Sequence, residues 1–137
     1  MKRLMSILLG LVFCLMLSSC ADMDNGKGVV LVEKDSFFSD FSIEDNEVKL
    51  YCHIVVNNQF GTKKFARFQG DFKNDVRGGL VVDQILTAYD PEDPNISQFV
   101  LQPGINSIDI VFVGEHGCSN VKQNRLLPPI YVVLMDE

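Results

Sequence analysis

The sequence lacks most of the patterns that enzymes and nucleic-acid-binding proteins use. Its 137 residues include no tryptophan and two histidines, with 12 basic residues against 18 acidic ones. It contains no Gly-x-Ser-x-Gly nucleophile elbow, no phosphate-binding glycine loop and no basic patch with interleaved aromatic residues. Catalysis needs a nucleophile or an acid–base pair held within reach of each other. We therefore expect no enzyme and no cofactor, and we expect this acidic chain to bind no nucleic acid.

The sequence also lacks an apolar run long enough to span a membrane. The run at residues 4–17 has about fourteen residues, whereas a spanning helix needs about 20. Lys2 and Arg3 precede this run, and Leu17-Ser18-Ser19-Cys20 end it. A basic start, a short apolar run and small residues before a cleavage point are typical of a secretory signal peptide. We predict that residues 1–19 are removed.

The cysteine directly after the small residues makes this segment similar to the lipobox of bacterial lipoproteins. In that family the cysteine thiol receives a diacylglycerol, a signal peptidase cuts just before it, and the cysteine becomes the first mature residue. The resemblance implies that Cys20 is a lipidation site. It also implies a protein anchored by lipid to the cell membrane or outer membrane, with its domain outside the cytoplasm. An aspartate after the cysteine favours inner-membrane retention in that family, but Ala21 holds this position here.

The predicted mature chain is one domain with a short tether. Loss of Lys2 and Arg3 leaves ten basic residues against 18 acidic ones, a net charge of −8. Net charge therefore does not attract the domain to anionic lipid, and the acyl anchor must hold it at the membrane. Residues 20–28 are polar and contain glycine, so after Cys20 they form a flexible tether of about 15 Å. Residues 29–137 are long enough for one domain with its own core.

The pattern of apolar residues in this domain predicts β-strands. Residues 47–57 are the clearest case, because the apolar side chains alternate with polar ones along the whole segment. Residues 35–46 fit both a strand and a helical stripe, and we expect them to be extended. Two prolines make residues 90–95 a loop. The further predicted strands are residues 29–32, 63–72, 80–89, 97–101, 105–113 and 130–135.

About seven strands, with turn signals about every 8 to 12 residues, predict an all-β sandwich or barrel. This arrangement resembles an immunoglobulin-like antiparallel β-sandwich over residues 29–135. The resemblance is architectural, because the tryptophan of true immunoglobulin domains is missing. It implies that the strands at 105–113 and 130–135 are neighbours, with the strand that contains Phe65 beside them.

Two cysteines remain once the signal peptide is removed and Cys20 carries lipid. Cys52 and Cys118 can form a disulfide, because disulfides persist outside the cytoplasm. They can equally stay unpaired, with Cys52 acting as a small core hydrophobe. Both alternatives remain open, although a bridge would join a core strand to a loop.

The candidate metal ligands do not form a convincing site. His53 lies on the polar side of its strand, which predicts a solvated residue. His116 and Cys118 flank Gly117, but zinc sites need three or four ligands. A second cluster can offer oxygen ligands to calcium: Asp90, Glu92, Asp93 and Asn95. Because it lacks the glycine and the closing glutamate of an EF-hand loop, we interpret it as a solvated turn and expect no metal.

Two of the predicted strands are apolar on both faces, and this suggests an interaction surface. In an immunoglobulin-like order, one outward patch would contain Phe65, Val111, Val113, Tyr131 and Val133. A monomer seldom leaves such a patch bare. Alternatively, Phe37, Phe38 and Phe41 fold over that face as an internal cover. Two functions follow: a lipid-anchored binding or adhesion module for an envelope protein or glycan, or an accessory structural subunit of an envelope assembly.

Overall fold

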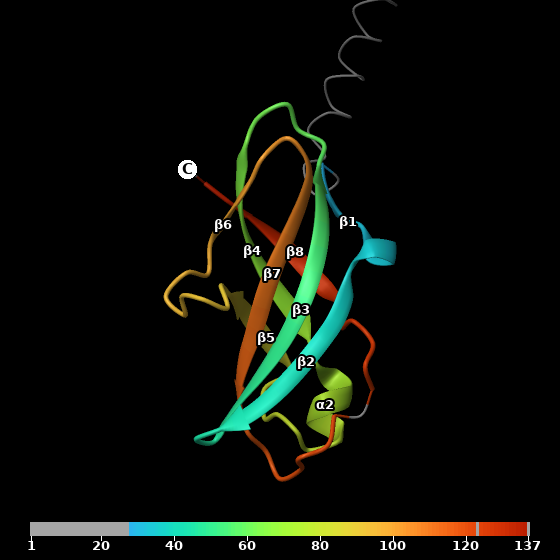
Figure 1. Cartoon of the computed structure of the whole chain (residues 1–137), viewed down its shortest axis with the longest axis vertical. Helices are drawn as coiled ribbons and strands as arrows, with labels where there is room; N and C mark the ends of the chain where they lie inside the picture. The colour runs from blue at the N-terminus through green and yellow to red at the C-terminus, as the bar shows by residue number, and fades with distance from the viewer. Residues whose placement is uncertain (1–27, 123, 137) are drawn as a thin grey trace, which may run out of the picture.

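The computed structural model describes residues 28–122 and 124–136, so the predicted signal peptide and Cys20 lie outside the described residues. The described chain is all-β and antiparallel, as predicted, and contains eight strands (Figure 1). The strands are β1 (Val29–Leu31), β2 (Phe37–Glu44), β3 (Glu47–Asn58), β4 (Lys64–Asp71), β5 (Ile85–Tyr89), β6 (Phe99–Leu101), β7 (Gly104–Glu115) and β8 (Ile130–Met135). A 3₁₀ turn, η2 (Glu33–Asp35), and a short helix, α2 (Lys73–Arg77), complete the structure.

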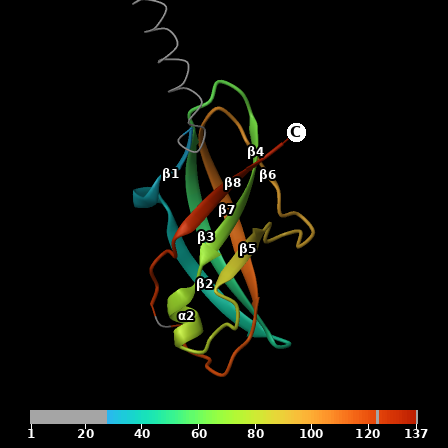
Figure 2. The ribbon, with the colours of Figure 1, turned by 180° about the vertical axis from the view of Figure 1, so that it is seen from behind.

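The strands form two layers that join along one side. In the first layer, which we call sheet A, β3 pairs with β1 and β2 along one edge and with β7 along the other. In the second, sheet B, β4 pairs with β8 on one edge and with β5 and β6 on the other. Strand β5 begins in sheet B, where Thr87 pairs with Gln69, and ends against β7, where Ala88 pairs with Phe112. Figure 2 shows the molecule from the side of β4 and β8.

The core lies between the two layers and follows the alternation predicted for residues 47–57. Val48, Leu50 and Ile54 of β3 are fully buried. They belong to one cluster with inward residues of the other strands, including Phe68 of β4. Phe72 meets Phe112 edge to face, with 5.0 Å between the ring centroids. Aromatic pairs in this geometry add stability beyond the area that they bury.

One local expectation is wrong between β4 and β5. Helix α2 follows β4, and the strand predicted at residues 80–89 begins only at Ile85. Leu80 and Val81 are nevertheless buried, and Val81 forms an isolated bridge with His116. Their apolar character therefore reflects packing at one end of the sandwich and not membership of a strand.

The segment 37–41 is extended, as expected, but it does not cover the outer face of the sheet. It forms strand β2, in which Phe38 pairs with Cys52. Phe38 is buried in the core, whereas Phe37 is exposed and stacks on His53, with 5.3 Å between their ring centroids. Asp45 and Asn46, both with positive φ, make the tight turn into β3, a conformation that Asp and Asn tolerate. The predicted internal cover is therefore wrong.

The predicted neighbourhood of β7 and β8 is also wrong. Strand β7 pairs with β3 and β5, whereas β8 pairs with β4. Because the end of β5 occupies the edge of β7, β8 is placed on the far edge of β4. The expected pairing of the Phe65 strand with residues 130–135 is confirmed, since Phe65 lies opposite Met135.

Candidate ligand-binding groove

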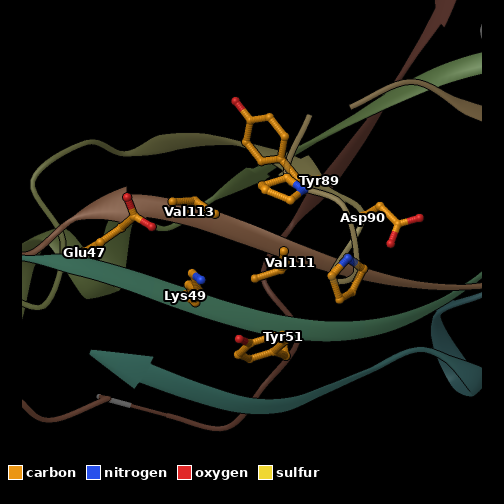
Figure 3. Close-up of a pocket in the computed structure, with 9 residues that line it drawn as sticks. Glu47, Lys49, Tyr51, Tyr89, Asp90, Val111 and Val113 are labelled. Carbon is orange, nitrogen blue, oxygen red and sulfur yellow. The ribbon is translucent and has the colours of Figure 1, made fainter. Parts of the chain in front are cut away.

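A groove of about 380 Å³ lies on the outer face of sheet A (Figure 3). Strands β3 and β7 form its floor, and the end of β5 with the following loop forms one side. The groove contains two of the three tyrosines in the chain. Its lining residues are Glu47, Lys49, Tyr51, Tyr89, Asp90, Pro91, Pro94, Val111 and Val113.

The strand register explains why these side chains meet. Tyr51 of β3 lies opposite Val111 of β7, and Val111 lies opposite Tyr89 of β5. Residues that are directly opposite in a sheet project from the same face. The three side chains therefore form one row, with a tyrosine on each side of a valine, as Figure 3 shows. Val111 is only 4% exposed, so this row gives the groove an apolar floor.

The loop at residues 90–96 is held in shape by its own polar groups. The Oδ1 atom of Asp90 accepts a hydrogen bond of 2.8 Å from the Glu92 amide, and the Asp90 amide donates to the Ile96 carbonyl at 2.9 Å. Asp93 Oδ1 accepts from the Asn95 amide at 3.0 Å. The acidic cluster noted in the sequence thus contributes two carboxylate oxygens to turns, and the loop forms a defined wall beside Tyr89.

Carboxylates dominate one end of the groove. Glu44, Glu47 and Glu115 lie directly opposite one another across β2, β3 and β7. A neighbouring hollow shares Glu47 and Val113 with the groove and adds Asp45, Asn46, Asp83, Gly114 and Glu115. Lys49 is the one basic residue among those that line the groove. In residues 28–122 and 124–136, neither Lys49 nor Glu47 forms an ion pair with an oppositely charged side chain.

The structure divides the predicted interaction surface between the two sheets. Val111 and Val113 belong to the groove on sheet A, whereas Phe65, Tyr131 and Val133 lie on strands of sheet B. Tyr131 is 50% exposed and Val133 is 39% exposed. The five residues therefore do not form one patch, because β8 is not the neighbour of β7.

Sequence reasoning missed the two tyrosines and the wall of the groove. Tyr51 and Tyr89 are 38 positions apart in the printed sequence, and only the pairing of β7 with both β3 and β5 brings them to one row. The sequence carries one local sign of the groove: Tyr51 is an aromatic residue on the otherwise polar side of an alternating strand, where its ring and hydroxyl are both available for contacts.

The two cysteines of the domain are free thiols, so the disulfide alternative is not what the structure contains. Cys52 lies in the core, opposite Phe38 and Ile110, whereas Cys118 is exposed in the loop after β7. Burial raises the pKa of the Cys52 thiol to about 12, although the positive charge of Lys122 acts in the opposite direction. Cys52 therefore stays protonated and acts as a small core residue.

Neither histidine lies in the groove. His53 Nδ1 is 2.8 Å from Asp109 Oδ1 on the outer face of sheet A, and His116 Nε2 is 3.0 Å from the Ser119 carbonyl oxygen. Among residues 28–122 and 124–136, no group of three or more His, Cys, Asp or Glu side chains is arranged to hold a metal ion.

A second, smaller cavity of about 120 Å³ borders a buried ion pair. Lys122 Nζ lies 3.0 Å from Asp75 Oδ2, and both side chains are 4% exposed. The same ammonium donates to the Asn124 carbonyl at 2.9 Å and lies 5.0 Å from the centroid of the Phe38 ring. Because the ammonium of Lys122 neutralises Asp75, the ion pair fastens Lys122 to helix α2, and we interpret it as structural.

Comparison with known proteins adds no family to this geometry. No protein-family model, no curated protein and no solved structure matches the chain. Within the part of the chain that the structure describes, none of the helices has the length and apolar character needed to cross a bilayer. The choice of the groove on sheet A as the candidate site therefore depends on its geometry and chemistry alone.

Proposed function

We propose that the protein is a lipid-anchored, non-catalytic binding module of the bacterial cell envelope. Cys20 carries the lipid, and the groove on sheet A takes a protein or glycan ligand. The groove carries the proposal, because it combines an apolar floor, two amphipathic tyrosines and a few charged groups behind a defined wall. Ligand sites are commonly built this way, from an apolar surface with a small number of placed polar groups.

The position of the groove supports this proposal. The described chain begins at Gly28, and Val29 lies opposite Asn58 at one end of β3. Glu47, at the border of the groove, is at the other end of the same strand, where the β2–β3 hairpin turns (Figure 1). Twelve residues of strand separate the two ends by about 35 Å. With a membrane anchor at Cys20, the groove lies on the half of the domain that is remote from the attachment point.

The anchor is tested by replacing Cys20 with serine. We expect Cys20→Ser to abolish incorporation of labelled fatty acid and to leave the signal peptide uncleaved, because the lipidated thiol is what the peptidase of this family requires. The replacement of Cys14, within the predicted signal peptide, is the matched control and should change neither. Continued acylation and cleavage of the Cys20 variant would show that the lipoprotein assignment is wrong.

The groove is tested by pull-down from the native envelope with matched tyrosine variants. Tyr89→Ala removes one side of the groove, whereas Tyr131→Ala removes an exposed ring of the opposite sheet. We expect the first variant to lose a partner that the wild type and the second variant keep. If all three proteins retain the same partners, the groove is not the binding site.

A second function, an accessory structural subunit of an envelope assembly, is favoured by one observation on sheet B. Val100 of β6 and Tyr131 and Val133 of β8 are each at least 39% exposed, on the two strands that flank β4. Apolar surface of this kind often packs against a permanent partner. This function predicts that Tyr131→Ser combined with Val133→Ser releases the protein from a large complex on native gels, and that Tyr89→Ala does not.

A further inference from the structure

The acidic row at the end of the groove places like charges where they repel one another. Glu44, Glu47 and Glu115 lie directly opposite across three strands, and directly opposed like charges destabilise a sheet. All three side chains belong to exposed residues. The charge that would relieve this repulsion is positive, and Lys49 is the one basic residue among those that line the adjoining groove.

The rings of Tyr51 and Tyr89 also favour a positively charged ligand, independently of the acidic row. A Lys or Arg side chain over the face of a tyrosine is held by the ring quadrupole. The basic side chains of the described residues that lie over rings are placed on phenylalanines elsewhere: Lys63 on Phe65, Lys64 on Phe60, Lys122 on Phe38, and Arg125 on Phe38 and Phe41. Within this described part of the chain, no basic side chain lies over the ring of Tyr51 or Tyr89.

The spacing of the two features fits an extended chain. The tyrosine row at Tyr51 and the carboxylate row at Glu47 are four residues apart along β3, or about 13 Å. An extended polypeptide bridges that distance with side chains at positions i and i+4. Lys49 occupies the row between them, where it lies opposite Val113, and would disfavour a second cation at position i+2. A neutral or acidic ligand would leave the carboxylate row without a counter-charge.

We propose that the groove binds an extended, positively charged polypeptide segment. Its first lysine or arginine lies against Tyr51 and Tyr89, and a second basic residue four positions along lies against the row of Glu44, Glu47 and Glu115. The residue at the middle position is uncharged. This inference rests on the proposed function and narrows its ligand to one chemical class.

The test uses the full chain in non-ionic detergent and short fluorescent peptides, with binding followed by fluorescence anisotropy. The main probe is an otherwise neutral, extended peptide with two lysines four positions apart. Three further probes serve for comparison. In the first peptide the two lysines are adjacent, and in the second they are replaced by glutamates. The third probe is fluorescently labelled cellotetraose, a neutral glycan. We expect the main probe to bind at least about tenfold more tightly than the other three, and its affinity to fall as salt is raised.

Groove variants connect that binding to the proposed contacts. Tyr89→Ala should weaken the main probe by about tenfold, whereas Tyr89→Phe, which keeps the ring face, should stay within about twofold of the wild type. Glu47→Gln should weaken it by about threefold and reduce the salt dependence. Two matched controls should change little: Tyr131→Ala on sheet B, and Glu33→Gln in the exposed η2 turn.

The outcomes separate this inference from the function on which it rests. Equal binding of the glutamate peptide or of cellotetraose would overturn the preference for a cation, as would an unchanged affinity in Tyr89→Ala. If the lysine peptide fails to bind while Tyr89→Ala still loses its envelope partner in the pull-down, the cationic ligand is wrong and the binding module stands. If the pull-down is also unaffected, both are wrong.

Discussion

The two outer faces of the sandwich are built from similar strands but differ in what covers them. On sheet A, Val111 is 4% exposed because Tyr51, Tyr89 and the loop at 90–96 surround it. On sheet B, Val133 is 39% exposed beside Tyr131, which is itself 50% exposed. Both valines belong to strands that are apolar on both faces. Val111 lies on a strand that is paired on both edges and bordered by the loop after β5, whereas β8 pairs with β4 alone among the described strands. This difference separates a groove from an open surface.

The faces also differ in charge. The outer side of sheet A carries the row of Glu44, Glu47 and Glu115. On sheet B, the residue opposite Val133 is Arg67, and Lys63 Nζ lies 5.7 Å from the centroid of the Phe65 ring. Because shape and charge differ together, a ligand that suits one face does not suit the other.

The largest difference in stability between the two faces is expected when an aspartate replaces Val111 or Val133. Val111→Asp introduces an unpaired carboxylate at a buried site, and we expect a loss of about 3 kcal/mol or more in the free energy of unfolding. Val133→Asp places the same group at an exposed site and should cost less than about 1 kcal/mol. Urea denaturation of the two full-length variants measures both values.

Two uncharged substitutions serve as controls for that comparison. Val111→Asn and Val133→Asn match the aspartate side chain in size and shape but carry no charge, so the excess loss in each aspartate variant reports the cost of the charge itself. Equal losses for the two aspartate variants would mean that the two faces are equally covered, and the contrast drawn between them would not hold.

The thiol beneath the groove should make stability depend on pH. Cys52 follows Tyr51 in β3, and its pKa is raised to about 12 in the folded protein from 9.0. Since the folded pKa is the higher one, the contribution of Cys52 is fully present below pH 9 and is lost as the pH rises towards 12. Between pH 8.5 and 10 we expect a loss of about 1 kcal/mol from this group.

Alanine variants of the two thiols isolate the contribution of Cys52. Other groups also titrate above pH 9, so the quantity to compare is the change in unfolding free energy of the wild type against that of Cys52→Ala. Cys118→Ala, at the exposed thiol, should follow the wild type. If Cys52→Ala shows the same loss between pH 8.5 and 10 as the wild type, the buried thiol is not the source.

The sequence predicts the layers of this fold better than the site on them. Alternation in residues 47–57 depends on burial of one face, which is a local property, and β3 follows it closely. The order of the strands depends on β5 crossing from sheet B to the edge of β7, and no local pattern encodes that crossing. The immunoglobulin-like order therefore gives the strand at 130–135 the wrong neighbour, residues 105–113, where the structure has β4.

The groove could be predicted only in part for the same reason. The sequence indicates Val111 and Val113 because they are apolar on an otherwise polar side of their strand, and both line the groove. Tyr51 and Tyr89 join them through the register of three strands, which long-range pairing determines. The loop at residues 90–95 was expected from its prolines, but its hydrogen bonds show that it is a wall and not a loose turn.

The smallest expected effect concerns one positive charge on each face. Lys49 lies in the groove, whereas Arg67 lies on the outer side of sheet B. Loss of a positive charge about 10 Å from a bound cation in water changes the binding energy by about 0.4 kcal/mol, or about 0.8 kcal/mol for the two cations of the lysine peptide. We therefore expect Lys49→Gln to tighten binding of the lysine peptide by about fourfold at low salt. Arg67→Gln should have no effect in 0.1 M salt, because the screening length is then about 10 Å and two stacked sheets lie between the charges. Anisotropy titrations of both variants at low and high salt measure these differences. Weaker binding by Lys49→Gln would mean that Lys49 contacts an acidic or carbonyl group of the ligand, and the uncharged middle position of the proposed segment would then be wrong.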